Sequence, residues 1–247
     1  MKQIKVMTWN VLYKEKADNI LALVKKINPD ILCCQELTQN SQYNNFNTAD
    51  FLASQLGYQY YFEPADIISV DGEKFPLGNG VFARFPLSQP KKFLIHGGKN
   101  PSTGSPSEKR LYIEAKVNVN KKGLIIGTTH LSFTPWFEIT PKKRGETEAL
   151  VAEIKKNSQD FILAGDFNAK PDSYTIKQVE KYLKSAGPSS TEATFTTKPF
   201  SYMGMEANGL DYRIDYIFTT PDIKMLSSKI IKTEFSDHLP IVAEVQI

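Results

Sequence analysis

The segment ILAGDFNAKPDS, residues 162–173, places an apolar run directly before a carboxylate and an amide. Because side chains alternate along a strand, Asp166 and Asn168 are predicted to point the same way from the end of a buried strand. Two oxygen-bearing groups in that position suit a metal ion, a water molecule or a phosphate. Asp and Asn are also common in ordinary turns, so this segment alone leaves both interpretations open.

Polar side chains of the same kinds stand at the ends of other apolar stretches. These residues are Asn10, Glu36, His130, Asp215, Asp237 and His238. The chain has three histidines, and two of them belong to this set. Each residue on its own fits a cap, a turn or a hydrogen-bonded buried group. Together they favour one ligand site, because loops from several elements converge at the strand ends of an α/β sheet.

The composition is that of an ordinary globular protein, with 41% hydrophobic and 23% charged residues in 247. A net charge of +3 is too small to indicate nucleic-acid binding by itself, although it allows a local basic patch. We find neither a membrane-spanning apolar stretch nor a secretory signal, so we expect a cytoplasmic monomer that does not insert into membranes. The adjacent Cys33 and Cys34 are expected to be reduced, buried thiols.

Hydrophobic periodicity predicts mixed strands and helices in one domain over residues 1–247. Strands are expected at 3–11, 30–35, 58–63, 79–85, 91–95, 110–119, 124–131, 160–164, 212–218 and 239–247. Helices are expected at 14–27, 49–56, 141–156 and 173–185. Segments 38–50, 66–78 and 97–109 are expected to be loops that rim the site, and 188–211 is expected to be irregular. This pattern favours two packed sheets with outer helices.

Six short motifs carry a family resemblance. They are TWNV, CQEL, TTHL, GDFN, RIDYIF and SDHLP, in this order between residues 7 and 240. The chain thereby resembles the endonuclease/exonuclease/phosphatase superfamily, whose fold is like that of deoxyribonuclease I. The resemblance implies a four-layered α/β sandwich of two mixed β-sheets flanked by helices. It also implies hydrolysis of phosphoester bonds that depends on Mg²⁺ or Mn²⁺.

The resemblance implies a metal site on the carboxylates of the set. Glu36 is expected to be the main ligand, because Mg²⁺ prefers carboxylate oxygens, and Asn10 is expected to bind or orient beside it. Asp237 is expected to add a metal contact. Asp166 is expected to activate or orient the attacking water, and Asn168 to hold that water or the phosphate. A second metal near these last two residues is the alternative.

The two histidines are expected to flank the phosphate. His238 would donate a proton or stabilise charge, as imidazole can near neutral pH, and Asp215 would orient it through a hydrogen bond. His130 is expected opposite His238 across the scissile group. Glu108 matches a glutamate that partners this histidine in deoxyribonuclease-like relatives, but it fits an ordinary surface charge equally well.

Other residues are expected to be structural. Arg144 is expected to pair with Glu148 on its helix, with phosphate binding as the alternative. Arg84 and Arg110 are expected to have structural roles. Trp136 and its neighbour Phe137 are expected to pack beneath their loop, with stacking on a base or sugar as the alternative.

The expected activity is that of a metal-dependent phosphodiesterase acting on a nucleic acid or nucleotide. The alternative is a phosphatase of a small or lipid-derived phosphomonoester. The complete set of polar residues argues against a binding module without catalysis. The sequence THLSFTPWF differs from the corresponding segment of abasic-site endonucleases, and we expect no exposed apolar hairpin of the kind that membrane-active sphingomyelinases carry.

Overall fold

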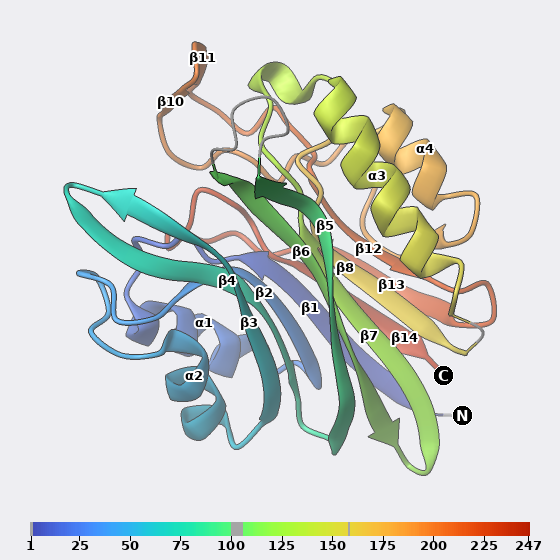
Figure 1. The fold of residues 1–247 in the computed structure, drawn as a ribbon. Coiled ribbons are helices and arrows are strands. Elements are labelled where there is room, and N and C mark those ends of the chain that lie inside the picture. Colours follow the sequence, from blue (N-terminus) through green and yellow to red (C-terminus); the bar gives the residue numbers. More distant parts are fainter. Residues whose placement is uncertain (1, 100–105, 158) are drawn as a thin grey trace.

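Two six-stranded β-sheets pack face to face in the computed structural model, which describes residues 2–99, 106–157 and 159–247 (Figure 1). The first sheet has the order β13 (Lys224–Ile230), β14 (Ile241–Gln246), β1 (Gln3–Asn10), β2 (Ile31–Thr38), β4 (Glu73–Ala83) and β3 (Gln59–Val70). The second has the order β5 (Leu87–Lys99), β6 (Pro106–Val119), β7 (Lys122–His130), β8 (Phe161–Asp166), β12 (Asp215–Thr219) and β9 (Lys184–Ser185).

Helices cover the outer face of each sheet. Helices α1 (Ala17–Ile27) and α2 (Thr48–Leu56) lie on the first sheet, and α3 (Pro141–Ile154) and α4 (Tyr174–Val179) lie on the second (Figure 1). Alternation along β1 explains the layers, since Val6 packs between the sheets whereas Met7 packs against α1. The predicted four-layered α/β sandwich is confirmed.

The topology gathers six strand ends at one edge of the sandwich. Strands β1 and β2 are parallel, as are β7 and β8, so the carboxyl ends within each pair lie together. Strands β14 and β12 run antiparallel to β1 and β8, which brings their amino ends to the same place. The residues that follow or precede these strands therefore converge, although they come from distant parts of the sequence.

Gly165 allows the close pairing of β8 with β7 immediately before Asp166. Its φ is +154°, and a Cβ at this position would lie 2.1 Å from the carbonyl oxygen of Thr129 on the neighbouring strand. Any larger residue would push the two strands apart at the point where they present their polar ends. The GDFN segment therefore needs its glycine for packing as well as for conformation.

The expected loop at 66–78 is wrong, because most of it forms the outer half of a long hairpin between β3 and β4. Asp71 and Gly72 make its turn, both with positive φ. An Asp-Gly pair is a strong local hairpin signal, so the sequence did contain the information. The expected loop at 97–109 is also partly wrong, since β5 extends to Lys99 and β6 starts at Pro106, and residues 100–105 lie outside the described part.

Other boundaries also differ from the predictions. The first helix begins at Ala17, and the helix expected at 173–185 ends at Val179. Strand β13 was not predicted, because its sequence KMLSSKI is mostly exposed and lacks a clear apolar alternation. Its lysines and its bulge are typical of an edge strand.

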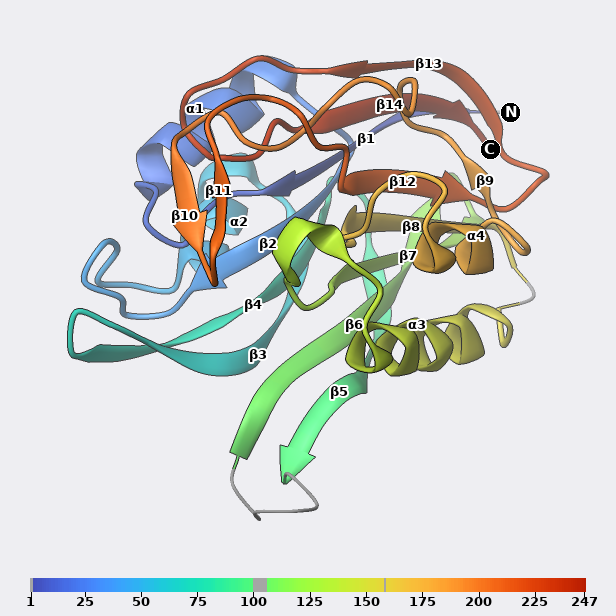
Figure 2. The same cartoon turned by 90° about the horizontal axis from the view of Figure 1, so that it is seen from above.

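The segment expected to be irregular contains a short hairpin of β10 (Phe200–Tyr202) and β11 (Met205–Ala207). It projects from the body of the two sheets (Figure 1), and in the view from above it overlaps the ends of β1 and β2 (Figure 2). Tyr202 and Met203 at its turn are 57% and 61% exposed. The expectation that the chain has no exposed apolar hairpin is therefore wrong. None of the described helices is long and apolar enough to cross a membrane.

Candidate active site

The polar residues identified in the sequence come together at the shared strand ends. Asp166 ends β8 and is the register partner of His130, which ends β7, and of Asp215, which begins β12. Asn10 ends β1 of the opposite sheet, yet its amide nitrogen lies 3.1 Å from Asp166 Oδ2. One carboxylate thus stands where the two sheets meet.

Asp166 is the centre of this arrangement. Its Oδ2 lies 3.4 Å from His130 Nε2 and 3.7 Å from His238 Nε2. Its Oδ1 accepts a 2.8 Å hydrogen bond from the backbone N–H of Asn168. Burial raises the pKa of Asp166 to about 7, while positive charge on His238 opposes the rise and the charge of Asp215 adds to it. A carboxylate with such a pKa can accept a proton near neutral pH.

The two imidazoles have opposite electrostatic environments. His238 Nδ1 donates a 2.9 Å hydrogen bond to Asp215 Oδ2. Burial disfavours its charged form, but Asp215 and Asp166 outweigh burial and raise the pKa of His238 well above its ordinary value. Burial lowers the pKa of His130 well below its ordinary value, and Arg110 adds to this effect. One histidine is therefore held charged and the other neutral, which is typical of acid–base sites.

Glu36 lies beside this group on a distorted part of β2. The pairing of β2 with β4 shifts register between Cys34 and Leu37, and Glu36 has a φ of +62°. Its Oε1 accepts a 3.0 Å hydrogen bond from the Asn10 amide, and its Oε2 accepts one of 3.1 Å from the Tyr13 backbone N–H. Bulges of this kind turn a side chain towards a site.

The oxygen-rich surroundings of Glu36 fit a hard divalent cation. Burial and the nearby carboxylate of Asp237 both raise the pKa of Glu36, so a positive charge between the two acids would stabilise them. Asn10 turns its amide nitrogen towards Glu36 and Asp166, and its oxygen accepts a 3.1 Å hydrogen bond from the Leu12 N–H. In this arrangement Asn10 orients the carboxylates.

Asp166 also belongs to a second group of side chains that could hold a cation. Ligand atoms of Asp166, Asp215 and His238 all lie within 4.8 Å of one another. The hydrogen bond between the last two, however, fits an acid–base pair better than a set of ligands. Asp215 Oδ1 is buried and has no hydrogen-bond partner among the described residues, so it is the atom of this group left free to meet a ligand.

Glu108 lies near the site but bonds to other groups than expected. It forms ion pairs with Arg110 and Lys142, and its Oε2 lies 3.0 Å from Ser132 Oγ. Burial opposes its ionisation, but Arg110 and Lys142 outweigh it and lower the pKa of Glu108 to about 2. No hydrogen bond joins it to His130 in the described part of the chain. The two cations attract it more strongly than a neutral imidazole can.

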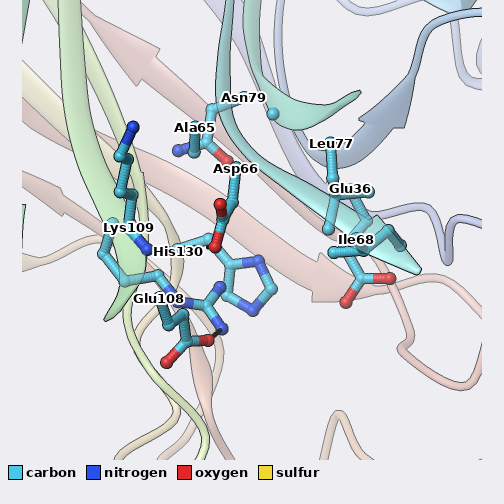
Figure 3. A pocket seen from close by; sticks show the side chains of 11 residues that line it. Glu36, Ala65, Asp66, Ile68, Leu77, Asn79, Glu108, Lys109 and His130 are labelled. Atoms are coloured by element: carbon cyan, nitrogen blue, oxygen red, sulfur yellow. Dashed lines mark hydrogen bonds and ion pairs between the residues drawn. The ribbon is translucent and has the colours of Figure 1, made fainter. Parts of the chain in front are cut away.

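A small pocket of about 80 Å³ opens between the β3–β4 hairpin and β6 (Figure 3). His130 and Glu36 reach it from different sheets, and Asp66 and Asn79 line it from the hairpin. Arg110, for which a structural role is expected, also lines the pocket and forms an ion pair with Glu108. The pocket therefore adjoins the candidate catalytic groups directly.

The remaining expectations are settled by packing. The guanidinium of Arg144 lies 4.3 Å from the centre of the Tyr174 ring, whose hydroxyl donates to Glu148 Oε1 at 3.2 Å. Tyr174 thus separates the ion pair that was expected. Arg84 bonds to Asn28 and the neighbouring backbone, as a structural residue should.

Trp136 and Phe137 behave differently from each other. Phe137 is buried against Phe195 and Tyr212, as expected. Trp136, in the short 3-10 turn η1 (Pro135–Phe137), is 48% exposed, and the expectation that it packs beneath the loop is wrong. Its backbone N–H donates to the Met205 sulfur at 3.1 Å, which ties η1 to the β10–β11 hairpin.

Two charged residues on α3, Lys143 and Glu146, are fully buried and were not predicted from the sequence. They lie in the run PKKRGETEAL, which reads as a solvated helix because charged residues are rarely fully buried. No local signal distinguishes Lys143 from the half-buried Lys142 beside it.

Comparison with known proteins agrees with this geometry. A family model described as the Endonuclease/Exonuclease/phosphatase family matches residues 7–238. The endonuclease/exonuclease/phosphatase from Beutenbergia cavernae DSM 12333 has a similar structure, with 20% identity and a TM-score of 0.78 over 100% of this chain and 72% of that one. No curated protein matches the chain.

Two further solved structures share the fold. The human Nocturnin catalytic domain with bound sulfate has 22% identity and a TM-score of 0.71 over 99% of this chain and 93% of its own. ANGEL2, a 2′,3′-cyclic phosphatase in complex with adenosine-2′,3′-vanadate, has 17% identity and a TM-score of 0.69 over 98% and 95%. The ordered strand-end motifs, the two-sheet sandwich and the family match agree: the chain belongs to the endonuclease/exonuclease/phosphatase family.

Proposed function

We propose that this protein is a phosphodiesterase that depends on Mg²⁺ or Mn²⁺ and cleaves its substrate by in-line attack of water on phosphorus. The observation that carries the proposal is the position of Asp166 beside the imidazoles of His130 and His238. His238 is hydrogen-bonded to Asp215, and the side-chain amide of Asn10 bonds to both Asp166 and Glu36. A base, an acid and a candidate cation ligand thus lie close enough together to act on one bound phosphate group.

Each group has a distinct part in the proposed reaction. Asp166 accepts a proton from the attacking water, and Asn168, whose backbone bonds to it, helps to orient that water. His238, held charged by Asp215, stabilises the phosphate and donates a proton to the leaving oxygen. The neutral His130, which lies beside Asp166 Oδ2 as His238 does, also contacts the phosphate. Together these groups handle charge and protons without large movements.

Glu36 and Asp237 are the residues proposed to hold the cation, with Asn10 orienting Glu36. When bound, Mg²⁺ or Mn²⁺ would supply positive charge against the phosphate oxygens. A second cation at Asp166 is less favourable, since the hydrogen bond between Asp215 and His238 uses one ligand atom of each residue. One cation at Glu36 is therefore the simpler proposal.

We propose a nucleotide or single-stranded nucleic acid as the substrate, because aromatic rings lead away from His238. The Phe195 ring lies 4.9 Å from the imidazole, Phe200 lies 5.0 Å from Phe195, and Phe133 lies 5.5 Å from Phe200. Tyr202, 5.6 Å from Phe133, ends this series at the surface. Tyr202 is the exposed ring of this series, and an exposed ring near a phosphate site can stack on a base.

A phosphatase of a small or lipid-derived phosphomonoester is the second candidate. The pocket of about 80 Å³ beside Glu36 and His130 supports it, because a space of that size fits a small group better than a nucleotide. A module that binds phosphate without catalysis is less consistent with the complete set of acid, base and carboxylate groups.

The test measures cleavage of bis-p-nitrophenyl phosphate, p-nitrophenyl phosphate and a labelled single-stranded oligonucleotide, with Mg²⁺ or Mn²⁺ and with EDTA. We expect diester cleavage that EDTA abolishes, that His238→Ala and Glu36→Gln lose, and that His96→Ala retains. His96 lies on β5, outside the site, and is the matched control. Activity on monoesters alone would favour the phosphatase, and undiminished activity in EDTA would contradict metal dependence.

A further inference from the structure

The first turns of α3 hold two fully buried charged side chains. Thr140 caps the helix by accepting the Lys143 N–H at 3.2 Å, and Lys143 and Glu146 both have 0% exposure. The helix is anchored to the sheet by apolar residues such as Leu150 and Ile154 farther along. The charged pair lies at the start of α3, where the helix contacts the segments that follow β7 and β8.

The Lys143 ammonium binds three backbone carbonyls from those two segments. It donates to the oxygen of Ser132, to that of Asn168 at 3.2 Å and to that of Phe167 at 3.4 Å. An ammonium has three donors, so its hydrogen-bonding capacity is fully used. Ser132 follows His130 by two residues, and Asn168 follows Asp166 by two.

Glu146 holds the same Ser132 from its other side. Its carboxylate accepts the Ser132 backbone N–H at 3.0 Å and also the Ser132 hydroxyl. The two segments are already joined directly, since Asn168 Nδ2 donates to the Leu131 carbonyl at 2.9 Å. Lys143 and Glu146 therefore fix the position of a unit that carries His130 at one end and Asp166 with Asn168 at the other.

Stability alone does not account for this pair. Taking a lysine and a glutamate out of water is costly, and well-packed apolar residues of similar volume often stabilise a fold as well or better. The hydrogen bonds of the pair instead fix the positions of the candidate catalytic groups, which matters because small displacements of reacting groups change reaction rates strongly. The charged side chains bond to backbone atoms one or two residues from the candidate catalytic residues.

We propose that Lys143 and Glu146 are positioning residues that set the placement of His130 relative to Asp166 and Asn168. The proposal rests on the proposed function for its kinetic readout. Removing the Lys143 ammonium releases three carbonyls from the two segments, so the base and the imidazole lose their fixed spacing. The effect belongs to the chemical step, because neither side chain reaches the surface to meet substrate.

The experiment compares Lys143→Met and Glu146→Gln with two controls. Leu150→Ala creates a cavity under the same helix and lowers stability without removing a hydrogen bond to either segment, and Lys177→Met removes an exposed lysine from α4. We expect Lys143→Met to lower kcat on the diester about 10- to 100-fold with KM changed less than about twofold. Glu146→Gln, which keeps the side-chain shape, should lower kcat less. Both controls should have the wild-type kcat when they are assayed at a temperature well below their melting temperatures.

A second readout is independent of activity. Backbone amide exchange at Leu131 and Asn168, whose N–H groups bond to Asp166, should become about tenfold faster in Lys143→Met but not in Leu150→Ala. If wild type cleaves no phosphoester, the proposed function fails and the exchange measurement still decides this proposal. The proposal would be overturned if the exchange rates at Leu131 and Asn168 in Lys143→Met equalled those of wild type. It would also be overturned if Leu150→Ala, at the same stability, lost as much kcat as Lys143→Met. If Lys143→Met does not fold, Glu146→Gln carries both measurements.

Discussion

Replacing Asp215 by Asn tests the acid half of the proposed site. Asp215 and His238 are buried, and one 2.9 Å hydrogen bond joins Oδ2 to Nδ1. Asn has the same shape but no charge, and its amide nitrogen cannot accept the imidazole N–H. His238 then loses both its charged partner and the group that fixes its tautomer.

The magnitude follows from this one contact. A hydrogen bond to a charged group contributes roughly 1.5–3 kcal/mol. If the loss falls on the transition state, kcat decreases by about 10- to 150-fold, since each 1.36 kcal/mol is a factor of ten. A wrong tautomer would deepen the loss further. Stability should fall as well, because the substitution leaves the buried His238 without its charged partner.

The assay measures kcat and KM for a phosphodiester with saturating Mg²⁺, together with the melting temperature. The control is Asp222→Asn, the same chemical change at an exposed position after β12. We expect kcat to fall in the first variant only, with both proteins folded. Wild-type kcat in a folded Asp215→Asn protein would refute the assignment of Asp215 and His238 as an orienting pair.

Two predictions concern stability. Phe167 is fully buried, and the centre of its ring lies 5.6 Å from that of Tyr216 and 5.4 Å from that of Phe218. In urea titrations, Phe167→Ala should therefore lower the free energy of unfolding by about 3–5 kcal/mol, and the control Leu226→Ala, at an exposed position, by less than about 1 kcal/mol. Equal losses in the two variants would contradict the packing. Burial lowers the pKa of Lys143 from 10.5 to about 8, so between these pH values the unfolded chain binds a proton that the folded chain has released. The stability of wild type relative to Lys143→Met should therefore rise with pH across this interval, by at most about 3 kcal/mol, and a difference independent of pH would show that the lysine does not titrate there.

Local patterns in the sequence determined much of the fold and the identity of the site residues. Apolar alternation located most of the strands, and a polar residue at the end of an apolar run is visible without knowing what lies opposite. Asp166, His130 and Asp215 were found in this way, and the topology then made them neighbours. The hairpin turn at Asp71 and Gly72 was equally local, and it was missed although its signal is present.

The partners of these residues were decided by the tertiary structure. Glu108 meets Arg110 and Lys142 in place of His130, and Tyr174 lies over Arg144 where a helical ion pair was expected. A hydrogen bond depends on angstrom distances between side chains that are far apart in the sequence, and the order of residues along the chain does not contain those distances.

Burial was the other property that the sequence left undecided. Lys142 and Lys143 are adjacent and chemically identical, yet one is paired near the surface and the other is fully enclosed. The difference arises because α3 presents one of them to the ends of β7 and β8, where carbonyl oxygens replace the water that an ammonium needs. The sequence determined which chemical groups this protein has at its strand ends, and packing of the two sheets and α3 decided how those groups are charged, paired and held.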